Sequence, residues 1–184
     1  MKKFSWIIAL FAVLALMFVG CPGDGDNPGS GGGNGGTIET GKLTEIFPRT
    51  VSTASATISI KNDILTVTSG TSTTRLDADL LTAEGGFNAS AYKGIKFEYK
   101  SNIQLNAGLQ DGIDPNSMWL IVGWGHLVVT DQWTEITCRF GSDLEKAWGN
   151  STAFNPSKFE KIWFGSDNPD KDTKFEMRNF AFIK

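Results

Sequence analysis

Apolar and polar residues alternate along most of the chain beyond residue 36, with the two-residue period of a half-buried β-strand. In residues 95–100, Ile-Lys-Phe-Glu-Tyr-Lys, the alternation is unbroken, so one side of this strand is buried and the other meets solvent. Two similar runs flank Asn62-Asp63, a two-residue connection that suits a tight hairpin. The strands predicted in this way are residues 57–61, 64–68, 95–100, 103–109, 118–122, 133–140, 161–165 and 174–183.

Strand parity also assigns a face to each side chain. The period places Ile162 and Phe164 in the core and Trp163, which lies between them, on the outer face. Trp133 is expected in the core, whereas the parity of Trp124 is ambiguous. Polar side chains expected on outer faces are Glu98, Gln104, Asn106, Thr137, Arg139 and Arg178.

One segment is predicted to be helical. Residues 142–145, Ser-Asp-Leu-Glu, match a capping box, and Gly149-Asn150 would end the helix after one to two turns. Helices that alternate with strands are absent from the pattern, which excludes a doubly wound α/β fold. The predicted fold is all-β: one domain, residues 37–184, made of two antiparallel sheets packed face to face in a β-sandwich.

The first 20 residues have the pattern of an export signal. Lys2 and Lys3 precede an apolar run over residues 4–19, and Gly20 is a small residue at the expected cleavage point. The run is shorter than the roughly 20 residues that a membrane-spanning helix needs. A signal peptide is therefore predicted, with a retained membrane helix as the alternative.

Residues 18–21, Phe-Val-Gly-Cys, resemble the lipobox of bacterial lipoproteins. The box usually has Leu where this chain has Phe18, a departure similar to the relaxed boxes of spirochaetes and some Bacteroidetes. The resemblance implies a lipid on Cys21, the membrane as a partner through that lipid, and a location in the bacterial cell envelope, at the outer membrane or the cell surface. Residues 21–36 are mostly Gly, Asp, Asn, Pro and Ser and are expected to be a flexible tether. The alternative is a soluble secreted protein.

Charge and rare residues exclude several functions. Loss of Lys2 and Lys3 with the signal changes the net charge from −3 to about −5, so nucleic acid is not expected as a partner. With Cys21 lipidated, Cys138 is the one remaining thiol, and no intramolecular disulfide can form. His126 is the single histidine, which excludes mechanisms and metal sites built on a histidine pair.

Three segments resemble jelly-roll carbohydrate-binding modules. Residues 87–101 are similar to their opening, in which small residues, a tyrosine, a lysine and a glycine precede a strand, and residues 130–144 are similar to their tryptophan-led strand and its following turn. Residues 159–165 and 175–183 resemble the last two strands. The resemblance is to the galactose-binding-domain-like sandwiches, including family 11 carbohydrate-binding modules and the complex I intermediate-associated protein domain. It implies a jelly roll that binds a polysaccharide or oligosaccharide.

Sugar recognition needs a flat apolar ring to cover a pyranose, together with hydrogen-bonding groups that bind its hydroxyls. The hypothesis is an extended glycan across one sheet face, with Trp163 covering a ring and Arg139, Gln104 and Asn106 bonding hydroxyls. The residues predicted to form this site are Trp163, Arg139, Gln104, Asn106, Thr137, Glu98, Arg178 and Trp124.

Other functions remain as alternatives. The same face could engage a protein partner, and a third hypothesis is a glycoside hydrolase, which would need a carboxylate pair. No catalytic motif accompanies the outward Glu98, Glu135 and Glu176, so no enzyme activity is expected. No cofactor is expected either, although the acidic turns at 111–116 and 167–172 leave structural calcium open. The relatives often carry an Asp-Asn pair near their last strand, where this chain has Arg178-Asn179, and this difference argues against the structural calcium that many of them bind. The domain is expected to be monomeric.

Overall fold

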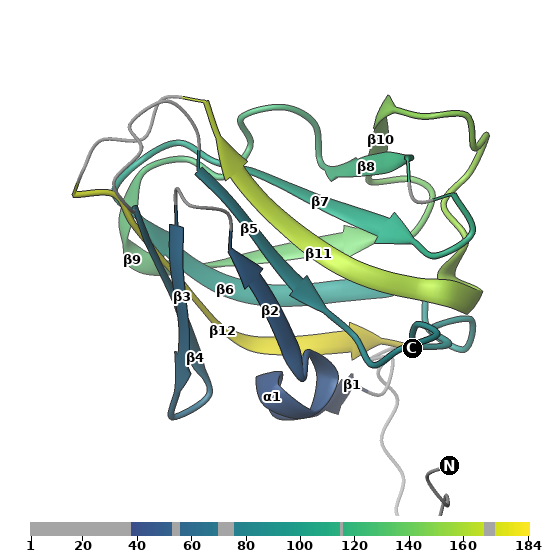
Figure 1. The fold of residues 1–184 in the computed structure, drawn as a ribbon, viewed down its shortest axis with the longest axis horizontal. Coiled ribbons are helices and arrows are strands. Elements are labelled where there is room, and N and C mark those ends of the chain that lie inside the picture. The colour runs from purple at the N-terminus through teal and green to yellow at the C-terminus, as the bar shows by residue number, and fades with distance from the viewer. Residues whose placement is uncertain (1–37, 53–55, 70–75, 115, 168–171) are drawn as a thin grey trace, which may run out of the picture. The chain divides into compact units, whose positions relative to one another are not determined.

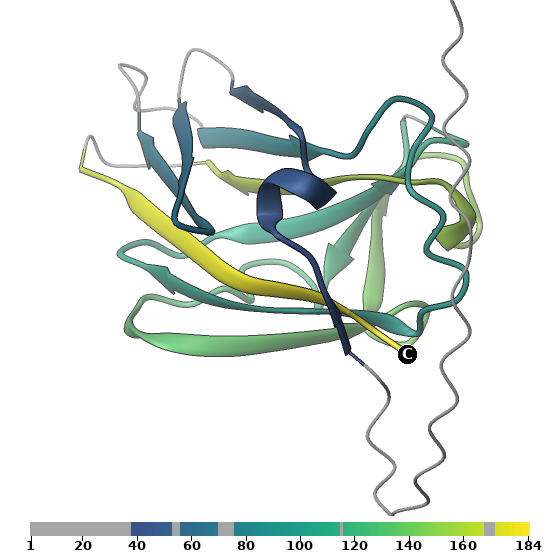
Figure 2. The same cartoon turned by 90° about the horizontal axis from the view of Figure 1, so that it is seen from below.

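The computed structural model describes residues 38–52, 56–69, 76–114, 116–167 and 172–184. These residues form two antiparallel β-sheets packed face to face, which confirms the predicted sandwich (Figure 1). Figure 2 shows the two layers from the side. The predicted signal peptide, the predicted lipid-attachment site Cys21 and the tether predicted for residues 21–36 lie outside the described residues. No helix in the described part of the chain is long and apolar enough to cross a membrane.

Each sheet combines strands from distant parts of the chain. Sheet A has the order β3-β4-β12-β6-β9, with β1 also paired to β12, and sheet B has the order β10-β8-β7-β11-β5-β2. The strands of sheet A are β1 (Ile38–Thr40), β3 (Ala56–Lys61), β4 (Ile64–Ser69), β6 (Gly94–Ser101), β9 (Thr130–Arg139) and β12 (Lys174–Ile183). Those of sheet B are β2 (Arg49–Ser52), β5 (Leu76–Leu81), β7 (Asn106–Asp111), β8 (Met118–Ile121), β10 (Leu144–Trp148) and β11 (Phe159–Ser166). The helices are α1 (Leu43–Ile46) and the 3₁₀ turn η1 (Pro156–Lys158).

The core lies between the sheets and is rich in aromatic rings. Phe164 of sheet B meets Phe175 and Phe97 of sheet A at centroid distances of 4.5 Å and 6.0 Å. Burying a side chain of this size stabilises a fold by roughly 1.5–3 kcal/mol. Ile162 and Phe164 are fully buried, as strand parity predicts. Cys138 is also buried, and desolvation raises the pKa of its thiol to about 12.

The predicted hairpin at Asn62-Asp63 is confirmed. Both residues have positive φ angles, 52° and 58°, between β3 and β4. Such a turn has the twist of the flanking strands, and Asn and Asp tolerate this conformation better than most residues.

The helix predicted from the capping box is wrong. The segment is the edge strand β10, which pairs with β8. The Asp143 carboxylate accepts hydrogen bonds from the Arg139 backbone N–H at 2.8 Å and the Ser142 hydroxyl at 2.8 Å, so it closes a turn. A helix of one or two turns is unstable in isolation, whereas pairing with β8 satisfies the backbone of the segment.

Candidate carbohydrate-binding site

The outer face of sheet B, opposite the core, carries Trp163 at its centre. A Cβ placed on Gly165 would lie 2.0 Å from Cζ2 of Trp163, and one on Gly108 would lie 3.3 Å from Cε3. The indole therefore lies flat on the sheet, in the space that these two glycines leave free. Its Nε1 donates a hydrogen bond to Asp77 at 3.0 Å.

Trp163 has the predicted face but not the predicted exposure. Only 8% of it is accessible, because it packs with Met118, Leu120 and Ala147 in a small cluster separate from the main core. The expectation of an exposed Trp163 ring is wrong. A glycan cannot stack on this ring in the conformation described.

Two other tryptophans extend the aromatic surface. Trp148 contacts Trp163 edge-on at 6.2 Å, and Trp124 lies against Trp148 at 6.1 Å with a tilt of 33°. Exposure rises along this series, to 42% for Trp148 and 56% for Trp124. We call the three residues the tryptophan cluster. Trp124 is the member of the cluster that is most accessible to a ligand.

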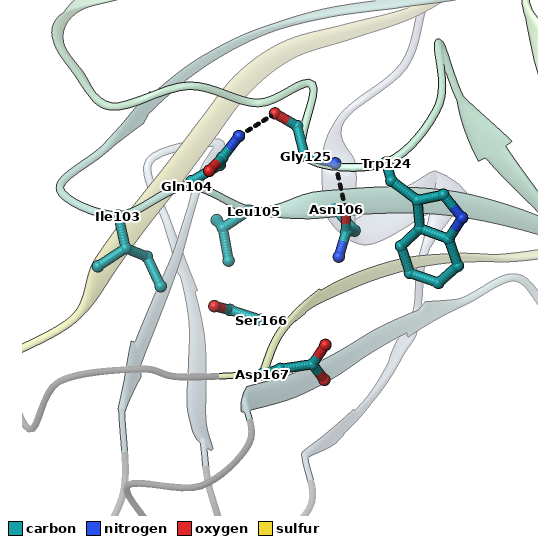
Figure 3. A pocket seen from close by; sticks show the side chains of 8 residues that line it. All are labelled: Ile103, Gln104, Leu105, Asn106, Trp124, Gly125, Ser166 and Asp167. Atoms are coloured by element: carbon teal, nitrogen blue, oxygen red, sulfur yellow. Dashed lines mark hydrogen bonds between the residues drawn. The ribbon is translucent and has the colours of Figure 1, made fainter.

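A pocket of about 440 Å³ lies beside Trp124 (Figure 3). This volume is in the range of small-molecule sites, roughly 300–1,000 Å³. Its described lining combines one indole with several hydrogen-bonding groups. The lining residues are Ile103, Gln104, Leu105, Asn106, Trp124, Gly125, Ser166 and Asp167.

Gln104 and Asn106 hold the loop that carries Trp124. Nε2 of Gln104 donates to the Gly125 carbonyl at 2.6 Å, and Oδ1 of Asn106 accepts from the Gly125 N–H at 2.5 Å. Gly125 has a φ of 67°, a conformation that favours glycine. The two amides thus position the Trp124 loop, and both residues also line the pocket. The prediction that these residues face outward is confirmed.

The remaining predicted residues lie on the other sheet. Glu98, Thr137, Arg139 and Arg178 are on β6, β9 and β12, and they occupy the outer face of sheet A. The expectation that they share one face with Trp163 is therefore wrong. Two-residue parity separates inside from outside within a strand, but it does not specify the sheet to which the strand belongs.

Ion pairs occupy the outer face of sheet A. Glu98 accepts from Nε of Arg178 at 2.6 Å, and Glu135 accepts from Lys96 at 3.1 Å. Glu176 pairs with Lys174 at 2.8 Å. All three outward glutamates considered for hydrolysis are thus neutralised by a cation.

Trp133 also lies on this face, and the prediction that it belongs to the core is wrong. The guanidinium of Arg178 stands 4.1 Å from the centroid of its ring and the ammonium of Lys100 stands 4.9 Å away. Both cations interact with the π-face, so the ring is occupied by the protein's own side chains.

Sequence reasoning misses Trp148, Ser166 and Asp167 as residues of the site. The capping box places Trp148 in a predicted helix. In the structure Trp148 is on β10 and pairs with Met118, so both side chains lie on the outer face of sheet B. Ser166 ends β11, and Asp167 stands out in the sequence only as part of an acidic turn.

The acidic turn at 111–116 uses its carboxylates to bind backbone. Oδ1 of Asp111 accepts from the Ile113 N–H at 3.1 Å, and Oδ2 accepts from Asn155 at 2.9 Å. Oδ2 of Asp114 accepts from the Ser117 hydroxyl at 2.6 Å and from the Ser151 N–H at 3.2 Å. Within the described ranges no group of three His, Cys, Asp or Glu side chains is placed to hold a metal ion. Residues 168–171 of the second acidic turn, the other place considered for calcium, lie outside those ranges.

The fold is that of several carbohydrate-binding modules. The chain is similar to a mutant of a family 29 carbohydrate-binding module, with a TM-score of 0.51 and 12% identity over 73% of this chain and 79% of that one. The family 11 module from Clostridium thermocellum, solved with a β-1,3-1,4-mixed-linked tetrasaccharide, gives a TM-score of 0.51 and 17% identity over 73% and 87%.

A larger protein, PfGH50B, has a TM-score of 0.56 and 14% identity over 74% of this chain. The chain spans 22% of the length of PfGH50B. No protein-family profile matches the sequence, and no curated protein matches it either. These similarities define the class of fold, a jelly roll of the carbohydrate-binding-module type.

Proposed function

We propose that the chain is a non-catalytic carbohydrate-binding protein, held at the bacterial cell envelope by a lipid on Cys21, that binds a glycan in the pocket beside Trp124. The observation that carries this proposal is the exposed Trp124 ring at the edge of a preformed polar pocket. A large exposed indole is unusual on a soluble surface and marks an interaction site.

The chemistry of the pocket fits a sugar. The ring of Trp124 supplies the apolar plane for one face of a pyranose, and the amides of Gln104 and Asn106 with the Ser166 hydroxyl supply donors and acceptors for its hydroxyls (Figure 3). Two hydrogen bonds to Gly125 fix the loop before binding, which reduces the entropy lost on association.

Two alternatives are less well supported by the site. A protein partner would favour a broad flat apolar patch, whereas Trp124 borders a pocket with polar groups. Hydrolysis would favour two carboxylates free to act as acid and base, and Glu98, Glu135 and Glu176 are all in ion pairs. The solved carbohydrate-binding modules that share the fold support the same conclusion.

The test is binding of the purified chain to five neutral polysaccharides: cellulose, mixed-linkage β-glucan, mannan, xylan and galactan. We expect at least one to bind the wild type. Trp124→Ala should weaken that binding by about 2 kcal/mol, roughly thirtyfold, since the indole is the main stacking surface.

Arg139→Ala is the matched control. Arg139 is exposed on the outer face of sheet A, so its loss should leave both the affinity and the melting temperature close to those of the wild type. Equal affinities of the wild type and Trp124→Ala would reject the pocket. Loss of binding in Arg139→Ala alone would place the site on sheet A.

A further inference from the structure

The described lining of the Trp124 pocket contains one ionisable side chain, the carboxylate of Asp167. It lies across the pocket from Gln104 and Asn106, beside Ser166 (Figure 3). Asp167 is exposed, so a charge on a bound ligand would interact with this carboxylate partly through water.

A second carboxylate lies near the pocket on the same face. The exposed Glu145 projects outward from β10. Glu145 reaches the Trp124 loop, because a Cβ on Gly123 would lie 2.8 Å from its Oε2.

The described cations of this face lie at the other end of β5 from the pocket. Nζ of Lys161 pairs with Asp79 at 3.1 Å, and Lys161 lies opposite Leu81, whereas Ser166 of the pocket lies opposite Leu76. Arg49, on the edge strand β2, is also opposite Leu81 and donates two hydrogen bonds to the Thr82 carbonyl at 3.3 Å and 3.0 Å. Among the described residues, no arginine or lysine lines the pocket.

We propose that Asp167 makes the pocket selective by charge, so that it accepts neutral glycan chains and rejects those that carry carboxylate or sulfate groups. This inference rests on the proposed function of the same pocket. An anionic sugar would give up its hydration for a site that offers no counter-charge, and like charges placed together disfavour the wrong partner.

The size of the effect follows from the exposure of the site. Two like charges about 6 Å apart in water repel by roughly 0.7 kcal/mol, which is about threefold in affinity. Salt at about 0.5 M shortens the screening length to a few ångströms and should remove most of this discrimination.

The experiment compares each of the five neutral polysaccharides with its carboxymethylated derivative at low ionic strength. The readout is the dissociation constant of the carboxymethylated chain divided by that of the neutral chain. Any hydrogen bond that both chains make cancels in this ratio. The wild type should bind the neutral chain more tightly. Asp167→Asn should lower the ratio about threefold, and added salt should lower the wild-type ratio by a similar factor.

Glu84→Gln is the matched control, because it removes the same charge from the other end of β5. Asp167 is next to Ser166, which pairs with Leu76 at the start of β5. Glu84 lies three residues after Leu81, where β5 ends, so the six residues of the strand separate the two sites. That length is roughly 20 Å, more than three times the roughly 6 Å used for Asp167, so the direct repulsion of a ligand charge is less than a third as large. The ratio for Glu84→Gln should equal that of the wild type.

The outcomes separate the two proposals. Binding of a neutral chain with the same ratio in the wild type and Asp167→Asn would overturn the role of Asp167 and leave the glycan site intact. Equal shifts in Asp167→Asn and Glu84→Gln would also overturn it, since net charge would then be the cause. Absence of binding to all ten polymers would contradict the proposed function itself.

Discussion

At Gly165 a missing side chain determines where an aromatic ring lies. The indole of Trp163 occupies the space that a Cβ would need, and its Nε1 reaches Asp77 from that position. A larger residue at 165 would lift the ring from the sheet and disturb its contacts with Met118 and Trp148. The glycine is therefore a requirement of side-chain packing and not of backbone conformation.

We expect Gly165→Ala to destabilise the protein by about 1–3 kcal/mol, the usual cost of overpacking a filled site. The change should also weaken glycan binding, because Trp163 supports Trp148, and Trp148 supports Trp124. Chemical denaturation measures the first effect and calorimetry measures the second.

Gly112→Ala is the control for that substitution. A Cβ at Gly112 would meet its nearest atoms at 3.7 Å, which is ordinary contact, so the change in stability should stay within about 0.5 kcal/mol. Equal stabilities of the two variants would show that Trp163 can move aside without cost.

At the scale of secondary structure, two loops are joined by one carboxylate. Asp114 lies between β7 and β8, and it binds the backbone N–H groups of Asn150 and Ser151, which follow β10, at 3.2 Å each. Its hydrogen bonds, the Ser117 hydroxyl first and the Asn116 N–H second, lower its pKa from 3.8 to about 2. The ionised form is thus the one that the fold prefers.

This preference predicts an acid dependence of stability. Between about pH 4 and pH 2 the unfolded chain binds a proton at Asp114 that the folded chain does not, so the free energy of unfolding should fall as the pH falls through this range. Asp114→Asn should lower the melting temperature at pH 7 and should flatten this part of the pH profile. An unchanged profile in the variant would assign the acid dependence to other carboxylates, such as Asp143, whose pKa is also lowered.

Strands with an unbroken apolar alternation can be predicted from the sequence, whereas β5 and β10 are missed. The pattern misses β5 because Asp77 and Asp79 are of a type rare in strands, although Leu76, Ala78 and Leu80 alternate with them and are buried. It assigns β10 to a helix because a capping box is a local signal, while the pairing of β10 with β8 is a long-range contact. Local patterns do not contain the partner that stabilises an edge strand.

At the scale of the whole molecule, the sandwich can be predicted but the composition of its faces cannot. Parity identifies Gln104 and Asn106 as outward, yet joins them with Arg139 and Arg178 from the opposite layer. The strand order decides which outward residues share a face. It cannot be derived from local patterns, because β7 pairs with β11 and β9 pairs with β6, which are far away in the chain. Trp133 is a different case, because it shares the odd positions of Thr137 and Arg139 on β9, so parity alone places it on the outer face where two cations cover it.

The anchor is the prediction that concerns the whole chain. Replacing Cys21 with Ser removes the thiol that would carry the diacylglycerol, so labelled palmitate should no longer be incorporated and the protein should leave the membrane fraction. Cys138→Ser is the control, and it should be labelled like the wild type, because Cys138 is buried in the domain. Continued labelling of Cys21→Ser would contradict the assignment.

The place where the chain enters the domain has a mechanical consequence. The first described strand, β1, is three residues long and pairs with β12 in sheet A, whereas the tryptophan cluster is on sheet B. If a lipid holds the N-terminus while a glycan holds the pocket, tension enters the domain through β1. The few hydrogen bonds of β1 are then the first to carry the load and to break. Because β1 does not belong to sheet B, the glycan should stay bound after β1 has detached.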